Sequence, residues 1–433
     1  MKAVFEFLFS IITTSATAFR PAVRKLRQLG HLLLALGLAL VPIAGKAGDL
    51  NLSSAPLFLG TSVEPNITFV SDDSGSMDWD VTILGNQGRF TITGQNRTRT
   101  YSYVMCNKGA NDYCRSFGGK WDNNYAWYWS VGRVLPSEEA VIAAWGSAPY
   151  GVWRARFSGY NVQYYNPEIT YTPWPGVDSS GTAFGNINPA LALLDPYNPG
   201  GLTADLSNNF SYRSHQVPRP FSGGYITLDV NNYYPARYYL WTDSDSDGVV
   251  DPNDVHTRIE IRSGNEPFVH TSGNRGDCVN PLACTYAEEM QNFANWFSYY
   301  RRREAAAKNA IGKFAGGSIN VRLAYATMHN NRKGLGANNI GIASMNIDPT
   351  TGNKRTLLDG LYKTQSSGGT PLRQTLRDTG RYYECVSGNI FGASGSGCPI
   401  LPAASGGACQ QNFTVLMTDG YWNGSSPGVA NTD

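Results

Sequence analysis

Two short apolar segments near opposite ends of the chain each end abruptly in an aspartate-bearing loop. Asn66 to Ser71 (NITFVS) leads into residues 72–77 (DDSGSM), and Phe413 to Thr418 (FTVLMT) leads into Asp419-Gly420. A short apolar run with β-branched residues that stops at a polar turn is typical of a buried strand. The chain is also low in charge and rich in Gly, Asn, Ser, Tyr and Trp, which suits strands and turns more than a helical bundle.

Helical patterns lie between these two strands. Thr285 and Glu288 form a candidate capping box, and apolar residues then recur at helical spacing until Gly316-Gly317. We expect one long amphipathic helix here, packed on the sheet. A glycine-rich loop at residues 366–371 (SSGGTP) precedes a second helix, and its Pro371 suits the first helical position.

Two further strands are predicted at Ile319 to Met328 and at Asn339 to Met345. The order of elements then predicts an open α/β sheet with helices on both faces. Ligands gather beyond the carboxyl ends of the strands in such sheets. All three polar loops are expected at that edge, or at a helix start beside it.

The three loops together carry a candidate metal site, with Asp72, Ser74, Ser76, Thr370 and Asp419 as its ligands. A small divalent cation such as Mg²⁺ or Mn²⁺ prefers about six oxygens and keeps some of its water. We expect the three hydroxyls to bind the ion directly and the two carboxylates to bind it through water. So few direct negative charges leave the ion able to accept a carboxylate from a partner.

This pattern resembles the metal-ion-dependent adhesion site of von Willebrand factor A (VWA) and integrin-type domains, which implies a VWA-type sheet. Each loop alone is typical of an ordinary turn. The three loops in the right order favour the metal site, and a metal-free VWA fold with a degenerate site is the alternative.

A second candidate metal site lies in residues 243–254 (DSDSDGVVDPND). Its spacing is typical of a Ca²⁺-binding loop, and its candidate ligands are Asp243, Asp245, Asp247, Val249 (through its carbonyl), Asp251 and Asp254. The last position holds Asp rather than Glu, and Ala236 to Trp241 and Val255 to Ile261 look like flanking strands. We therefore expect a fixed structural clip rather than a helix-opening sensor. A solvated acidic turn is the alternative.

The N-terminus has the order of an export signal. A basic stretch around Arg24 is followed by an apolar run from Leu32 to Ile43 and by small residues up to Ala47. The run is shorter than the roughly 20 residues that a membrane-spanning helix needs, so we expect cleavage after Ala47, with an uncleaved anchor as the alternative. No other segment is apolar enough to span a bilayer.

Removing the first 47 residues changes the charge of the chain. Their net charge of +5, taken from the +2 of the whole chain, leaves −3. Nucleic acid is therefore not an expected partner, because phosphate binding needs clustered Lys and Arg.

The seven cysteines fall into three groups: Cys106 with Cys114, Cys278 with Cys284, and Cys385 with Cys398 and Cys409. In an exported chain such short spacings predict local disulfides. One cysteine of the last group is then left over, either as a free thiol or paired with sequence beyond Asp433. Zinc is disfavoured because no Cys-x-x-Cys occurs.

The expected domain organisation has four parts: an export signal (1–47), a first VWA segment (48–78), a disulfide-pinned, strand-rich insertion with the Ca²⁺ loop (79–284), and the remainder of the VWA domain (285–433). The insertion holds eight of the ten tryptophans, and its length favours a core role for most of its aromatic residues over a ligand surface. The sequence stops before the last elements of a VWA sheet, so we expect the domain to be incomplete.

Four segments resemble the PilC/PilY-type pilus-biogenesis proteins: residues 72–77 (DDSGSM), 292–301 (NFANWFSYYR), 368–372 (GGTPL) and 417–422 (MTDGYW). The resemblance implies an exported protein at the cell surface or pilus tip, or in the periplasm or outer membrane. It implies pilus-tip subunits and a host-cell or abiotic surface ligand as partners. An assembly factor whose VWA domain binds pilus subunits is the alternative to an adhesin.

Two remaining features concern other functions. Arg275-Gly276-Asp277 spells an integrin-recognition tripeptide, but three common residues often meet by chance. An enzyme is not expected, because the sequence has no nucleophile elbow, His-Glu-x-x-His helix or phosphate loop.

Overall fold

The computed structural model describes residues 63–78, 82, 89–94, 97–102, 153, 156–218, 225–248, 254–329, 339–391, 397–420 and 422–429. The predicted export signal and the Cys106/Cys114 pair lie outside these residues. None of the helices in the described ranges combines the length and the apolar character needed to cross a membrane.

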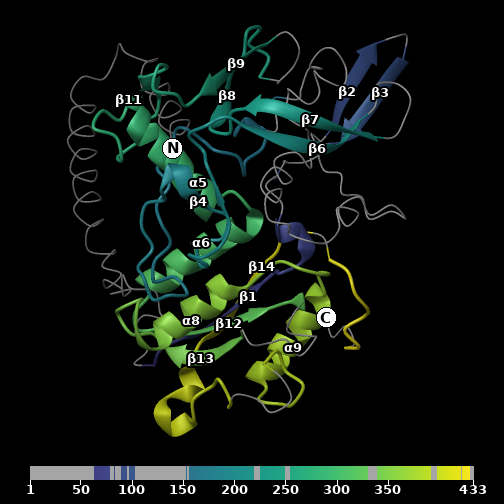
Figure 1. Cartoon of the computed structure of the whole chain (residues 1–433). Helices are drawn as coiled ribbons and strands as arrows, with labels where there is room; N and C mark the ends of the chain where they lie inside the picture. Colours follow the sequence, from purple (N-terminus) through teal and green to yellow (C-terminus); the bar gives the residue numbers. More distant parts are fainter. Residues whose placement is uncertain are drawn as a thin grey trace, which may run out of the picture. The chain divides into compact units, whose positions relative to one another are not determined.

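A four-stranded sheet brings the remote segments together, in the order β13-β12-β1-β14. Its strands are β1 (Asn66–Ser71), β12 (Arg322–Thr327), β13 (Ile340–Ser344) and β14 (Asn412–Met417). β1 is parallel to both β12 and β14, whereas β13 runs antiparallel to β12. The loops after β1 and β14 therefore leave the same edge of the sheet (Figure 1).

Helices cover both faces of the sheet. Because successive side chains along a strand point to opposite faces, neighbouring residues pack against different helices. Phe69 of β1 and Tyr325 of β12 pack with α6 (Arg303–Gly317) and α8 (Gly352–Lys363). The next residue along each strand, Val70 or Ala326, packs on the other face with α9 (Leu372–Tyr383). The mixed α/β sheet with helices on both faces agrees with the sequence pattern. Pro371 precedes the first residue of α9 rather than forming it.

The single long helix expected after Thr285 is wrong, because the structure has two helices there. α5 (Tyr286–Tyr299) begins with the predicted capping box, and α6 starts at Arg303. Arg301 folds back over the Phe297 ring, with its guanidinium carbon 4.4 Å from the ring centroid. Arg302 then takes an extended conformation, with φ −95° and ψ 153°. These two arginines end one helix and set the direction of the next.

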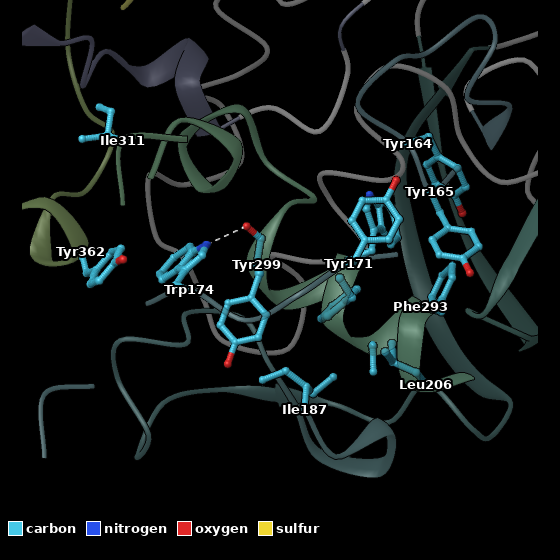
Figure 2. Close-up of a cluster of buried hydrophobic side chains, with 14 of the residues drawn as sticks. Tyr164, Tyr165, Tyr171, Trp174, Ile187, Leu206, Phe293, Tyr299, Ile311 and Tyr362 are labelled. Carbon is cyan, nitrogen blue, oxygen red and sulfur yellow. Dashed lines mark hydrogen bonds between the residues drawn. The ribbon is translucent and has the colours of Figure 1, made fainter. Parts of the chain in front are cut away.

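α5 does not pack on the central sheet as a simple amphipathic helix. Most of its residues from Glu289 to Tyr299 are buried, including Asn292, Asn295 and Ser298. Aromatic rings of the insertion surround it (Figure 2). Tyr164 contacts Trp296 at 4.8 Å between ring centroids, and Trp174 donates its indole N–H to the Tyr299 carbonyl at 3.0 Å. These aromatic residues therefore form core, as the length of the insertion predicted.

The strands described between residues 79 and 284 form hairpins rather than one sheet. The longer pairs are β2 (Arg89–Gly94) with β3 (Arg97–Ser102), β6 (Phe210–Pro218) with β7 (Tyr225–Tyr233), and β8 (Arg237–Thr242) with β9 (Val255–Glu260). Two-residue pairs join β4 (Ala192–Leu193) to β5 (Thr203–Ala204) and β10 (Phe268–Val269) to β11 (Ala283–Cys284). Short 3₁₀ turns occur at Gly75–Asp78 (η2), Pro189–Leu191 (η5), Ala403–Ser405 (η6) and Gly407–Cys409 (η7).

Two local disulfides are present in the described residues. Cys278 is bonded to Cys284, and Cys385 is bonded to Cys398. Cys409 is an exposed free thiol. Cys409 is therefore the unpaired member of the last group of three cysteines, in which one was expected to be left over.

Candidate metal centre

The loop after β1 folds tightly around the Asp72 carboxylate. The backbone N–H of Ser74 donates to Asp72 Oδ1 at 2.9 Å, and the chain then enters η2. The Ser74 and Ser76 hydroxyl oxygens lie 3.0 Å apart. Asp72 and Ser74 are almost fully buried. Three of the predicted ligands therefore form one compact group of oxygen atoms.

The loop after β14 reaches the same group. The Thr418 hydroxyl donates to Asp72 Oδ2 at 2.8 Å, and the Asp72 N–H donates to the Met417 carbonyl at 2.8 Å. Asp419 follows at once, and its charge acts on the Asp72 carboxyl. The parallel register of β1 and β14 pairs Ser71 with Met417, which is why the two loops meet.

The glycine-rich loop completes the arrangement. Gly75 N–H donates to the Gly368 carbonyl at 3.1 Å, and Ser367 N–H donates to the Asp73 carbonyl at 2.6 Å. Thr370 is buried, and Asn423 holds it by two bonds: Thr370 N–H donates to Asn423 Oδ1 at 3.0 Å, and Asn423 N–H donates to the Thr370 carbonyl at 2.8 Å. The three loops predicted to carry the ligands thus meet at one edge of the sheet.

Gly368 is required by the way this loop packs. Its φ is +77°, and a Cβ at this position would overlap the His329 ring. The ring Nδ1 of His329 accepts a hydrogen bond from Gly369 N–H at 3.0 Å, and the backbone N–H of His329 donates to Asp73 Oδ1 at 2.6 Å. A larger residue at position 368 would therefore separate the glycine-rich loop from the loop after β1.

Burial raises the pKa of the Asp72 carboxyl above its ordinary value, and the charge of Asp419 acts in the same direction. Hydrogen bonds from Ser74 and Thr418 act against this shift. A buried carboxylate beside a second one is costly to leave ionised, and a nearby cation offsets that cost. The donor set of hydroxyl and carboxylate oxygens fits a small, hard divalent cation.

The start of α6, with its N-cap residue Arg302, contacts η2 and the other two loops, and the sequence pattern did not predict these contacts. Arg302 binds Asp78 Oδ1 at 2.9 Å, Arg303 binds Asp419 Oδ2 at 2.6 Å, and Glu304 accepts a hydrogen bond from the Ser366 hydroxyl. The run of charges at residues 301–304 in the middle of an otherwise helical pattern was the available signal. Their partners are too remote in the sequence to be inferred from spacing.

The acidic loop at 243–254 lies between β8 and β9, as predicted, and the two strands pair up to Thr242 and Val255. Carboxylate oxygens of Asp243, Asp245 and Asp254 lie within 4.8 Å of one another. Gly248 has φ +73°, and its N–H donates to Asp243 Oδ2 at 2.9 Å.

Two further backbone N–H groups of the loop donate to Asp243 and Asp254. Asp247 N–H donates to Asp243 Oδ1 at 3.3 Å, and Ser244 N–H donates to Asp254 Oδ1 at 3.0 Å. Val249 and Asp251 lie outside the described residues. The first, third and last positions of the predicted Ca²⁺ loop therefore converge.

The arginine of the Arg275-Gly276-Asp277 tripeptide is buried, whereas Gly276 and Asp277 lie at the surface. The Arg275 side chain has no exposed surface and binds Glu289 Oε2 at 2.6 Å and Asp277 Oδ2 at 2.9 Å. A guanidinium held in this way is not available to an integrin, so the tripeptide has a structural role.

Comparison with known proteins gives relatives of one kind. The chain is 25% identical over 430 residues, or 95% of its length, to the type IV pilus biogenesis factor PilY1 of Pseudomonas aeruginosa strain UCBPP-PA14. It is 33% identical over 151 residues to PilY1 of strain PAO1 and 30% identical over 174 residues to PilY1 of strain PAK. These matches cover 34% and 38% of this chain.

The chain spans 28% of the length of the first of these relatives, and the two shorter matches cover 13% and 15% of theirs. No family model matches the chain, and no solved structure matches it. The resemblance to PilC/PilY-type proteins drawn from the sequence is thus confirmed by these relatives.

Proposed function

Because the chain is similar to PilY1-type pilus biogenesis factors along almost its whole length, we propose that it is an exported adhesion and pilus-biogenesis protein. Its metal-dependent site binds an acidic group of a ligand. The location is the cell surface or pilus tip. Pilus-tip subunits and a host-cell or abiotic surface that presents carboxylates are its partners, and it has no enzymatic role.

The sheet supports a VWA-type domain. Its order β13-β12-β1-β14 combines a parallel centre with one antiparallel edge strand, and helices cover both faces. The functional loops leave the carboxyl ends of β1 and β14 and the start of α9, which is where open α/β sheets bind ligands.

Mg²⁺ or Mn²⁺ is the proposed ion, held by Asp72, Ser74, Ser76, Thr370 and Asp419. When bound, the ion supplies an electrophilic centre that accepts a carboxylate oxygen from the partner. The protein's own part is to bury Asp72 and to hold it from two sides, through Ser74 N–H and the Thr418 hydroxyl. Neutral hydroxyls then complete a donor set of low total charge.

One observation carries the proposal: the Thr418 hydroxyl binds the Asp72 carboxylate at 2.8 Å although the two residues are 346 positions apart. An aspartate loop that served only as a turn would not need a partner from the far end of the chain. The contact places the two acidic loops together, and both face the glycine-rich loop that carries Thr370.

Titration with Mn²⁺ tests the metal site. At a hundredfold excess over the dissociation constant, bound metal is expected to stabilise the protein by about 2.7 kcal/mol, measured as a rise in the melting temperature. The double substitution Ser74→Ala/Ser76→Ala should abolish this rise. Ser318→Ala, which removes an exposed hydroxyl at the end of α6, should leave it intact. An unchanged melting temperature of the wild-type protein with Mn²⁺ and Mg²⁺ would refute the site.

A pull-down onto carboxylate-bearing surfaces then tests ligand binding. Wild-type protein should be retained with Mg²⁺ present and released by chelator, whereas Ser74→Ala/Ser76→Ala should not be retained in either condition. Retention that is equal with and without chelator would show that the metal is not part of the interface.

A structural assembly factor is the second candidate, since the relatives are named biogenesis factors. In that case the metal site binds pilus subunits instead of a foreign surface. Substituting the metal ligands in the cell separates the two functions. Surface pili that persist but fail to adhere indicate an adhesin, and loss of surface pili indicates an assembly factor.

We also propose that the acidic loop between β8 and β9 binds Ca²⁺ as a structural clip. Three carboxylates that converge within 4.8 Å would repel one another without a cation. Their position at the end of a hairpin, rather than between helices, suits a fixed brace.

A further inference from the structure

Arg303 lies beside the candidate metal site, at the start of α6. It is the first residue of α6, and its guanidinium Nη1 lies 2.6 Å from Asp419 Oδ2. Only 14% of the Arg303 side chain and 8% of the Asp419 side chain are exposed. An ion pair that is shielded in this way interacts more strongly than a pair at the surface.

Asp419 is one of only two carboxylates in the proposed ligand set. The Arg303 guanidinium already offsets the charge of Asp419, so a divalent cation that binds nearby gains less electrostatic free energy. The two cations would also repel each other. Arg303 and the metal ion are thus rivals for the same carboxylate.

A second contact gives Arg303 another place to bind. Its Nε donates to the Thr82 hydroxyl at 3.2 Å. This bond does not involve Asp419, so the guanidinium keeps a hydrogen-bond acceptor when its pairing with Asp419 weakens. Release of Asp419 therefore does not leave a buried guanidinium without any partner, which would be strongly unfavourable.

We propose that Arg303 is an internal counter-cation that competes with the divalent ion for Asp419 and so sets the metal affinity of the site. The inference rests on the proposed function, because it takes the metal site as given. Arg303 acts here as a tuning residue and does not contact the ligand. In the metal-free protein the Arg303–Asp419 pair holds the loop after β14 in place. In the metal-bound protein the ion takes over that role.

Isothermal titration calorimetry with Mn²⁺ on the purified protein tests this. Arg303→Gln should bind Mn²⁺ about tenfold more tightly than the wild type, the order expected when a unit charge close to an ion is removed. Arg303→Lys keeps the charge and should stay within about threefold of the wild type. Arg302→Gln is the control, because it removes a neighbouring positive charge that is bound to Asp78 instead of Asp419. It measures how much the loss of one positive charge changes the Mn²⁺ affinity in general.

The melting temperature without metal is a second readout. Arg303→Gln should lower it, because Asp419 loses its partner, and the rise caused by Mn²⁺ should be larger than in the wild type. A merely structural arginine would lower the melting temperature but leave the affinity unchanged. Circular dichroism confirms that each variant is folded.

The outcomes are distinguishable from failure of the metal site itself. If the wild type and all variants bind no Mn²⁺, the proposed function is wrong. If the wild type binds Mn²⁺ and Arg303→Gln binds it equally or more weakly, the counter-cation role is wrong and the metal site stands. An equal gain in Arg302→Gln and Arg303→Gln would also reject competition for Asp419, because it would show only a general charge effect.

Discussion

Arg275 lies at the centre of a buried polar network that joins the segment after β10 to α5. Its guanidinium contacts Glu289, Asp277, His270 Nε2 and the Pro167 carbonyl. The Tyr165 hydroxyl donates to the other Glu289 oxygen at 2.8 Å. Because removing one partner of such a network leaves the others buried and unpaired, the tripeptide that resembles a recognition motif is better understood as a structural brace.

The carboxyl of Asp277 should make stability depend on pH. Burial alone would raise its pKa, but hydrogen bonds from Arg275 and Thr170 outweigh that effect and hold the pKa below the ordinary value of 3.8. A carboxyl whose pKa is lowered by folding stabilises the protein above its unfolded-state pKa. That contribution is lost as the pH falls through the lowered pKa.

Asp277→Asn is therefore expected to lower the free energy of unfolding by about 2 kcal/mol at pH 7, since it weakens charge-assisted hydrogen bonds to a buried guanidinium. The difference from the wild type should shrink as the pH falls below about 4. Urea titrations across this range measure it. A difference that stays constant with pH would show that the charge of Asp277 contributes nothing.

At the scale of elements, the strands were the most predictable part. β1 was predicted at its observed bounds, and the predicted start and end of β14 lie one residue from those observed. These strands are short apolar runs cut off by polar loops, so the sequence pattern coincides with burial. Their pairing was also predictable in outline, because the two aspartate loops had to meet to form a site.

The end of α5 could not be predicted, because Arg is compatible with a helix interior. The helix ends there for tertiary reasons: Arg301 packs on Phe297, and Arg302 and Arg303 bind aspartates from other elements. The role of α5 as a core helix was equally hidden. Asparagine in a helix usually indicates an exposed position. Asn292 and Asn295 are instead buried and bind the backbone of the insertion.

Asn292 shows how α5 organises segments that have little regular structure of their own. Its side-chain oxygen accepts from Tyr171 N–H at 2.7 Å, and its amide nitrogen donates to the Ile169 carbonyl at 2.8 Å. Asn295 makes similar bonds to Ile187 N–H and the Tyr171 carbonyl, at 3.0 and 2.9 Å. Two asparagines one helical turn apart thus replace the partners that a sheet would provide.

Asn292→Ala should destabilise the protein by about 2–4 kcal/mol, because it leaves the buried Tyr171 N–H and the partly buried Ile169 carbonyl without their partner. Hydrogen exchange should become faster in residues 165–187 and change little in β1 and β12. Asn353→Ala is the matched control: this exposed residue on α8 makes one bond, to the Ser344 carbonyl, and its loss should cost less than about 1 kcal/mol. Equal costs for both would contradict the bracing role of α5.

At the scale of the whole molecule, the sequence predicted which loops meet but not which basic side chains contact them. The order of strands, helices and polar loops was enough to predict the position of the candidate metal site. The basic side chains beside it, Arg302 and Arg303, come from the junction between α5 and α6. They bind Asp78 and Asp419, which are 224 and 116 positions away in the sequence. Such contacts depend on the completed fold and leave no periodic pattern in the sequence.

The two proposed metal sites lie in different parts of this architecture, one at the edge of the central sheet and one at the end of the β8–β9 hairpin. They also suit different ions, since Ca²⁺ accepts more oxygen ligands and a less regular geometry than Mg²⁺. Selective removal of Ca²⁺ should therefore affect one site and spare the other.

Chelation by EGTA with Mg²⁺ in excess should make residues 243–254 sensitive to limited proteolysis, because the carboxylates of Asp243, Asp245 and Asp254 then repel one another. Asp245→Ala should weaken Ca²⁺ binding by about tenfold or more and show the same sensitivity with Ca²⁺ present. Neither change should alter the stabilisation by Mn²⁺ that depends on Ser74 and Ser76. If Asp245→Ala left both Ca²⁺ affinity and protease resistance as they are, the acidic loop would be a solvated turn. The hairpin would then be held by its strand pairing alone.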